Sequence, residues 1–453
     1  MSDIAIASPP RTFFGQPPAL GFLAFTEAWE RFSYYGMTSL LVLYMSQALF
    51  MPEHIGNIAG FAGYRAALEG VFGKMSTLAL ASQTYGLYTG FVYFTPLIGG
   101  WLADRFIGRR NAVVAGAILM SGGHIAMAFD ASFLLALFLL ITGCGLLKGN
   151  ISTQVGQLYA EDDATGRTRG FSIFSMAINV GAVAGPLTCG LLAQVYGWHI
   201  GFGMAGLLML FALATYLAGY RYLNETARST TTLEPARPLS VQQKRAIGAL
   251  ILVMLITIPH SISFYQNSNM GLVWINAHVD LMIGAFHMPA TWLGGALDSF
   301  FSIACVPFLI ALWRWQDRHG GEPGEIAKIG IGAALACVAN LVLAGGALLP
   351  DRVSPLFPFF YEVILGVAFI WQWPTLLALV SRIAPQRLKS TLMGAAFLTL
   401  FASNMTIGRI GALYEHMTPS AFWTLNAAIA ATGAVLAFLL RKPLTRIFES
   451  ENA

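Results

Sequence analysis

Long apolar runs recur along almost the whole chain and constrain its fold more than any other feature. A helix that crosses a bilayer needs roughly 20 mostly apolar residues. Twelve such runs lie near residues 19–49, 78–102, 111–129, 131–157, 169–196, 198–221, 246–276, 291–315, 326–348, 355–381, 390–414 and 419–440. Only 11% of the residues are charged, against about 25% in soluble domains. The sequence therefore predicts an all-α protein with twelve transmembrane helices, and it excludes a soluble enzyme or a basic nucleic-acid binder.

The positions of lysine and arginine predict the orientation of the chain. Cytoplasmic loops of membrane proteins carry an excess of these residues. If both termini lie in the cytoplasm, the outer loops contain only Arg65, Lys74 and Arg352, and the inner loops and tails contain most of the rest. We therefore expect a multi-pass protein of the cell (inner) membrane with both termini in the cytoplasm.

A polar stretch at residues 222–245 divides the predicted helices into two groups of six. The expected organisation is a cytoplasmic N-terminal tail at 1–18, a six-helix bundle at 19–221, a cytoplasmic linker at 222–245, a second six-helix bundle at 246–440 and a cytoplasmic tail at 441–453. This layout resembles that of major facilitator transporters. In transporters built from such repeats, the substrate site lies near the midplane between the halves.

The predicted loop between the second and third helices combines glycines with both signs of charge. Residues 99–110 read G-G-W-L-A-D-R-F-I-G-R-R and resemble the loop signature of major facilitator transporters. We expect Asp104, Arg105 and Arg109 to form a gate, a charge latch that differs between two conformations. The alternative is an ordinary positive inner loop, which accounts for the arginines but not for Asp104.

Charged residues within two predicted spans point to a polar interior. Glu27, Glu30 and Arg31 have the i, i+3 and i+4 spacing of one helix face. Ionised groups at membrane depth are costly unless they pair in a polar cavity, and a carboxylate beside an arginine can exchange that partner for a proton. Lys148 lies in the middle of an apolar span, so we expect a counter-ion or an anionic substrate group. The alternatives are a structural salt bridge and a lysine that snorkels to the interface.

Three sequence blocks resemble signatures of one transporter family. Residues 27–36, E-A-W-E-R-F-S-Y-Y-G, resemble the E-x-x-E-R-F-x-Y-Y-G helix-1 signature of proton-dependent oligopeptide transporters. Residues 171–181 resemble the helix-5 signature of that family, with Ser175 in place of its tyrosine, and residues 143–152 resemble its helix-4 lysine block, with Gly149 in place of proline. The chain therefore resembles a divergent member of this family.

The resemblance implies proton-coupled symport of di- and tripeptides or peptide-like small molecules by alternating access. Arg31 and Lys148 would bind the peptide carboxylate. Glu27 and Glu30, with Arg31, would couple peptide transport to proton transfer. Further substrate contacts are expected from Tyr34, Tyr35, Tyr93, Asn179 and Tyr265. The sequence contains no recognisable nucleotide loop, metal cluster or nucleophile, so we expect no enzymatic activity and no cofactor besides the proton gradient. The expected partners are the substrate, protons and the lipid bilayer, not nucleic acid, and the expected functional unit is a monomer.

The second half departs from the family pattern at charged positions. Tyr265 stands where helix 7 of the family has a glutamate, and Phe369 stands where helix 10 has the glutamate that reads the peptide amino group. Our hypothesis is that Asp298 supplies the replacement carboxylate, with Glu362 as the second candidate; a structural polar contact is the alternative for Asp298. These changes leave open a carrier of a non-peptide solute. A non-transporting membrane receptor is a weaker alternative, because the charges of the first half are retained.

Overall fold

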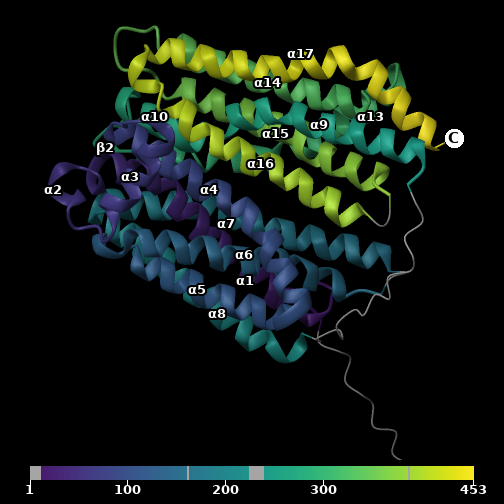
Figure 1. The fold of residues 1–453 in the computed structure, drawn as a ribbon, viewed down its shortest axis with the longest axis horizontal. Coiled ribbons are helices and arrows are strands. Elements are labelled where there is room, and N and C mark those ends of the chain that lie inside the picture. Colours follow the sequence, from purple (N-terminus) through teal and green to yellow (C-terminus); the bar gives the residue numbers. More distant parts are fainter. Residues whose placement is uncertain (1–11, 161–162, 224–238, 386–387, 453) are drawn as a thin grey trace, which may run out of the picture.

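The computed structural model describes residues 12–160, 163–223, 239–385 and 388–452. In this part of the chain the long helices form two sets that lie side by side (Figure 1). The first set consists of α1 (Pro18–Tyr44), α4 (Thr77–Leu102), α5 (Arg109–Ala126), α6 (Phe133–Gln157), α7 (Ala164–Tyr196) and α8 (Trp198–Gly219). The second consists of α9 (Val241–Tyr265), α12 (Leu297–Ala304), α13 (Val306–His319), α14 (Glu325–Gly346), α15 (Leu356–Ile383), α16 (Lys389–Gly411) and α17 (Pro419–Asn452).

All twelve predicted spans are helical, although they differ in how apolar they are. Among the described residues, eight helices are long and apolar enough to cross a membrane. A ninth span results if the segments Ala290–Ala304 and Val306–His319, which are bent by 43°, are taken together. The other three are α1, α4 and α5. Three charges lie within α1, α5 begins with two arginines, and α4 is rich in threonine, tyrosine and glycine. α1 and α4 are therefore less apolar because they carry polar groups into the interior, and α5 because its first turn is charged.

Short elements gather at one end of the molecule, which we call the hairpin end. They are α2 (Pro52–Ile55), α3 (Phe61–Phe72), α10 (Leu272–His278), α11 (Ala290–Leu293) and the two-stranded hairpin of β1 (Met282–Ile283) and β2 (Phe286–His287). The C-terminus lies at the opposite end, the tail end (Figure 1). The hairpin was not predicted, because two strands of two residues leave no periodic pattern in the sequence.

The predicted domain boundaries are only partly covered by the structure. Residues 224–238 of the predicted linker lie outside the described residues, so the division into domains stays a prediction. The start of α9 is set by a capping box in which Ser240 and Gln243 bond each other's backbone N–H groups. At the other end, α17 continues as a helix to Asn452, through most of the predicted tail at 441–453.

The two helix sets are joined by hydrogen bonds that extend from the middle of the molecule to the hairpin end. These bonds link Tyr93 to Tyr265, Ser82 to Asn269, Pro186 to Thr291, Leu187 to Trp292, Gln194 to His287, Phe72 to Arg409 and Ser76 to Glu415. Between them α4 and α16 pack closely, since a methyl group on Gly86 would lie 2.5 Å from the Asn404 carbonyl oxygen. The hairpin end is therefore closed.

Candidate functional site

The charged side chains of α1 form a closed ion cluster in the interior. Arg31 Nε lies 2.9 Å from Glu27 Oε1 and 2.6 Å from Glu30 Oε2. None of the three residues is more than 2% exposed. Removing one partner from a buried ion pair costs about 3–5 kcal/mol, because the other charge is left uncompensated. A change in the charge of one member therefore alters the charge balance around the other two.

Close packing of α7 against α1 places this cluster. A methyl group on Gly181 would lie 2.4 Å from the Ala28 carbonyl oxygen, and one on Gly185 would lie 2.5 Å from the Phe32 carbonyl oxygen. Small residues allow membrane helices to approach in this way. The glycine that ends the block at residues 171–181 thus has a structural reason: only a residue without a side chain lets α7 cover this part of α1.

Lys148 of α6 lies next to the cluster and is within electrostatic range of Glu30. Its ammonium group is 4.7 Å from the centroid of the Tyr93 ring, a cation–π distance. The Tyr93 and Tyr265 hydroxyl oxygens are 3.0 Å apart. Two carboxylates thus face two cations, so the charges of these four side chains balance. Lys148 and both tyrosines are partly exposed, whereas Arg31 is not, so a solute between the helices meets Lys148 first.

The other predicted contact residues of the first half differ in their accessibility. Tyr34 is buried beneath the cluster, with Arg31 Cζ 5.6 Å from its ring centroid. Tyr35, which packs edge-on against Tyr34 at 5.1 Å, and Asn179 of α7 are both partly exposed. Tyr35 and Asn179 are therefore accessible to a solute, whereas Tyr34 is not; the predicted substrate contacts of all three stay predictions.

Two acids of the second half meet around an amide that the sequence reasoning did not single out. The Asn267 amide donates a hydrogen bond to Glu362 Oε2 at 3.3 Å and also bonds the Asp298 side chain. Glu362 is fully buried, while Asp298 is partly exposed. The sequence feature that could have identified Asn267 is the polar triplet at residues 267–269, which follows the end of α9 within an apolar span. The hypothesised role of Asp298 toward a substrate amine stays a prediction.

The predicted gate residues lie at the tail end. Arg109 Nη2 is 2.9 Å from Asp104 Oδ1, and both side chains are partly open to solvent. Arg105 is exposed. The pair forms between the end of α4 and the start of α5, inside the first helix set. Its role as a latch stays a prediction, because a latch requires a second conformation.

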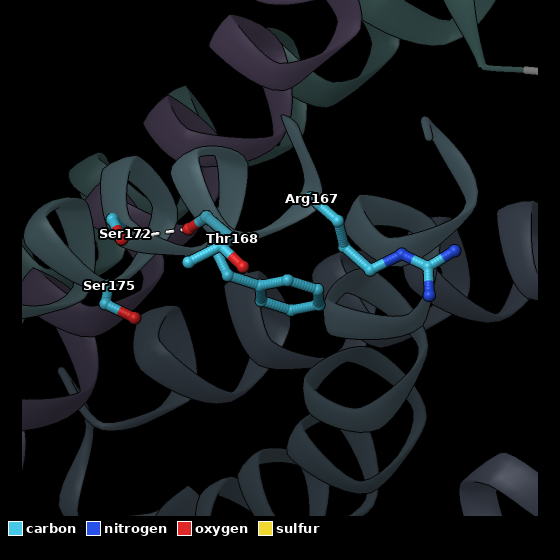
Figure 2. Close-up of a pocket in the computed structure, with 5 residues that line it drawn as sticks. Arg167, Thr168, Ser172 and Ser175 are labelled. Atoms are coloured by element: carbon cyan, nitrogen blue, oxygen red, sulfur yellow. Dashed lines mark hydrogen bonds between the residues drawn. The ribbon is translucent and has the colours of Figure 1, made fainter. Parts of the chain in front are cut away.

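A hollow of about 440 Å³ opens beside α7 near the tail end. It is lined by Arg167, Thr168, Phe171, Ser172 and Ser175 (Figure 2). The Ser172 hydroxyl donates to the Thr168 carbonyl oxygen at 2.9 Å. Thr168, Ser172 and Ser175 have helical i, i+4 and i+7 spacing, so their hydroxyls share one face of α7. This spacing was visible in the sequence but was not recognised there as a polar surface.

Two packed helix bundles, with a buried ion cluster in the first of them, define the class of protein, a secondary transporter of the major facilitator fold. The family model of the POT family matches residues 110–237 and 236–432. The chain therefore belongs to the POT family.

Curated relatives align over nearly the whole chain. A di-/tripeptide transporter of Lactococcus lactis subsp. lactis is 28% identical, with 96% of this chain and 97% of the relative covered. Peptide transporter YePEPT of Yersinia enterocolitica is also 28% identical, with 97% of each chain covered.

Solved structures match the fold of the whole chain. The crystal structure of a peptide transporter POT in complex with sulfate superimposes with a TM-score of 0.84, 24% identity and 97% of each chain covered. A POT family transporter in complex with 5-aminolevulinic acid gives a TM-score of 0.83 and 22% identity, with 96% of this chain and 99% of that one covered. These likenesses confirm the predicted major facilitator fold.

Proposed function

We propose that this protein is a proton-coupled symporter of di- and tripeptides or peptide-like small molecules. It works as a monomer by alternating access in the inner membrane, with both termini in the cytoplasm and no cofactor besides the proton gradient. The observation that carries the proposal is the buried ion cluster of Glu27, Glu30 and Arg31 beside the accessible Lys148. The names of the full-length relatives, which include di-/tripeptide transporters, support the substrate class.

The ion cluster couples substrate to proton by exchange of partners. Both carboxylates of the cluster engage the same Nε of Arg31. A proton on Glu30 leaves Arg31 with one carboxylate, and the carboxylate of an incoming peptide restores the second. Lys148 offers that peptide its first contact because it is the more exposed cation. Neither the proton nor the peptide is held well alone, since each leaves a buried charge uncompensated.

The closed hairpin end supports an assignment of this conformation to the inward-facing state. If the hairpin end faces outward, the cross-bundle hydrogen bonds seal the site from the outside. The hollow beside α7 then lies on the cytoplasmic side, where Thr168, Ser172 and Ser175 give the leaving peptide a polar surface (Figure 2). Asp104 and Arg109 hold the adjacent loop as a gate.

Reconstitution into proteoliposomes tests the proposal. An inward acid gradient should drive accumulation of labelled dialanine, and Lys148→Ala should abolish it. Lys244→Ala is the matched control, because Lys244 is an exposed lysine in the first turn of α9. If the folded wild-type protein moves neither dialanine nor any other di- or tripeptide under an acid gradient, the proposal is wrong.

A second candidate, a carrier of carboxylate solutes without an amine, is favoured by two contacts. Tyr265 binds Tyr93 where the family has a helix-7 glutamate, and Phe369 packs on Phe264 with ring centroids 5.4 Å apart. Neither position offers a carboxylate to an ammonium group. A thermal-shift comparison of dipeptides with monocarboxylates separates the two, because a bound ligand stabilises the folded state by mass action. A protein that binds such ligands but moves none of them would instead be a receptor.

A further inference from the structure

Close packing of two helices brings a pair of acids together in the second bundle. A methyl group on Gly366 of α15 would lie 2.7 Å from the Asp298 carbonyl oxygen of α12, and the Ser302 hydroxyl donates to the Gly366 carbonyl oxygen at 3.1 Å. Glu362 lies one turn before Gly366, on the same face of α15. The first turn of α12 therefore lies against the turn of α15 that carries Glu362.

Glu362 is fully buried, Asp298 is partly exposed, and both have only neutral partners among the described residues. The Asn267 amide bonds both acids, and no lysine or arginine forms an ion pair with either of them. Glu362 is fully buried, and its Oε1, like Asp298 Oδ1, is buried without a hydrogen-bond partner.

The titratable groups that face the pair from neighbouring helices are phenols. Tyr361 of α15 lies within electrostatic range of both acids, and Tyr35 of α1 and Tyr85 of α4 lie within range of Asp298. None of these groups supplies a positive charge. The described surroundings therefore leave two neighbouring carboxyl groups without a cation.

We propose that Asp298 and Glu362 share one proton and form a protonation site in the second bundle, separate from the ion cluster of α1. Two neighbouring carboxyl groups that are largely removed from water and have no cation beside them do not both ionise at neutral pH, so one of them holds a proton. A substrate ammonium group cannot reach Glu362, because that side chain is fully buried. A proton needs no such space and enters through the partly exposed Asp298.

The turn that holds the acid pair also touches the other bundle. Asn267 begins the wide helical turn Asn267–Gly271, and Asn269 of the same turn donates to Ser82 of α4 at 2.8 Å. Loss of the shared proton places a second negative charge against Asn267 and disturbs this turn. The protonation site is therefore linked to the contact that closes the hairpin end.

Infrared spectroscopy of the purified full-length protein tests the site directly. The wild type should show the C=O stretching band of a protonated carboxyl group at neutral pH, and the double variant Asp298→Asn, Glu362→Gln should lose it. Glu53→Gln is the control, since Glu53 is an exposed acid of α2. If the double variant does not fold, Asp298→Asn alone should shift the band, because it changes the partner of the remaining proton. An unchanged band in the variant that folds overturns the proposal.

Transport measurements distinguish whether the acid pair binds a proton or a substrate amine. This test rests on the proposed symport. The double variant should keep peptide counterflow but lose one proton per peptide in acid-driven uptake. If its affinity instead falls by about tenfold or more for dipeptides with a free amine, and not for N-acetylated ones, the pair binds the amine and the proposal is wrong. If the wild type moves no peptide but its carboxyl band is lost in the double variant, the protonation site stands and the proposed symport fails.

Discussion

The contact between α4 and α16 makes the balance between the two conformations testable. A methyl group on Gly86 would lie 2.5 Å from the Asn404 carbonyl oxygen, 3.0 Å from the Gly408 nitrogen and 3.2 Å from Gly408 Cα. All three atoms belong to the backbone of the other bundle, so no side chain can move aside. Overpacking of this kind costs about 1–3 kcal/mol. Because the clash exists only while the hairpin end is closed, Gly86→Ala should shift the conformational equilibrium by roughly 5–150-fold toward opening.

Distances between spin labels measure this shift. Ile200 near the start of α8 and Leu348 just after α14 are exposed positions near the hairpin end, one in each bundle. Gly86→Ala should move the distance distribution between labels at these positions toward longer values without lowering the melting temperature of the protein. Gly248→Ala is the matched control, since a methyl group there meets no atom within 4 Å. A Gly86→Ala distribution equal to that of the control, or a loss of stability at unchanged distance, would refute the reasoning.

Three further predictions concern the site and the short helix α3. Arg31→Lys keeps the charge but removes the guanidinium geometry that both carboxylates engage; losing one charge-assisted hydrogen bond, worth about 1.5–3 kcal/mol, should lower acid-driven dipeptide uptake by about tenfold or more. Tyr265→Phe removes the 3.0 Å bond to Tyr93 and should raise the KM for dipeptide by about 2- to 10-fold with little change in stability. Hydrogen bonds from the Arg65 side chain and the Met75 N–H lower the pKa of Glu69. The ionised Glu69 therefore stabilises the fold around α3. This stabilisation is complete above the ordinary glutamate pKa and is lost as the pH falls through the lowered pKa. Hydrogen–deuterium exchange around Met75, corrected for its intrinsic pH dependence, should show this loss in the wild type and not in Glu69→Gln.

The long helices were predictable because each bilayer span requires a long apolar run, whatever its tertiary neighbours. The three charges of α1 were predictable as one cluster for a similar reason: helical spacing alone places Glu27, Glu30 and Arg31 together. The acid pair was not predictable from the sequence, because Asp298 and Glu362 meet only where α12 approaches α15 at Gly366. That contact joins residues far apart in the sequence, and no local periodicity reports it.

Lys148 shows the same limit of sequence patterns, because its partner lies on another helix. Its position in an apolar span predicted a need for negative charge, but its partner could not be read from spacing. The structure places it near Glu30 of α1, with the Tyr93 ring under its ammonium group. Both contacts depend on how α4 and α6 pack against α1, which apolar patterning leaves open.

The buried charges of the two bundles are consistent with the predicted replacement of the family's helix-7 glutamate by Tyr265. In the first bundle, Glu27 and Glu30 are offset by Arg31 and Lys148, so no carboxylate from the second bundle is needed to neutralise Lys148. The second bundle then has to limit its own buried charge, and two acids with one shared proton carry a single negative charge between them. Among the described residues, each bundle therefore holds its buried charge without an ion pair to the other bundle. Such independence is what a carrier requires, because the bundles separate at one end and then at the other during every cycle.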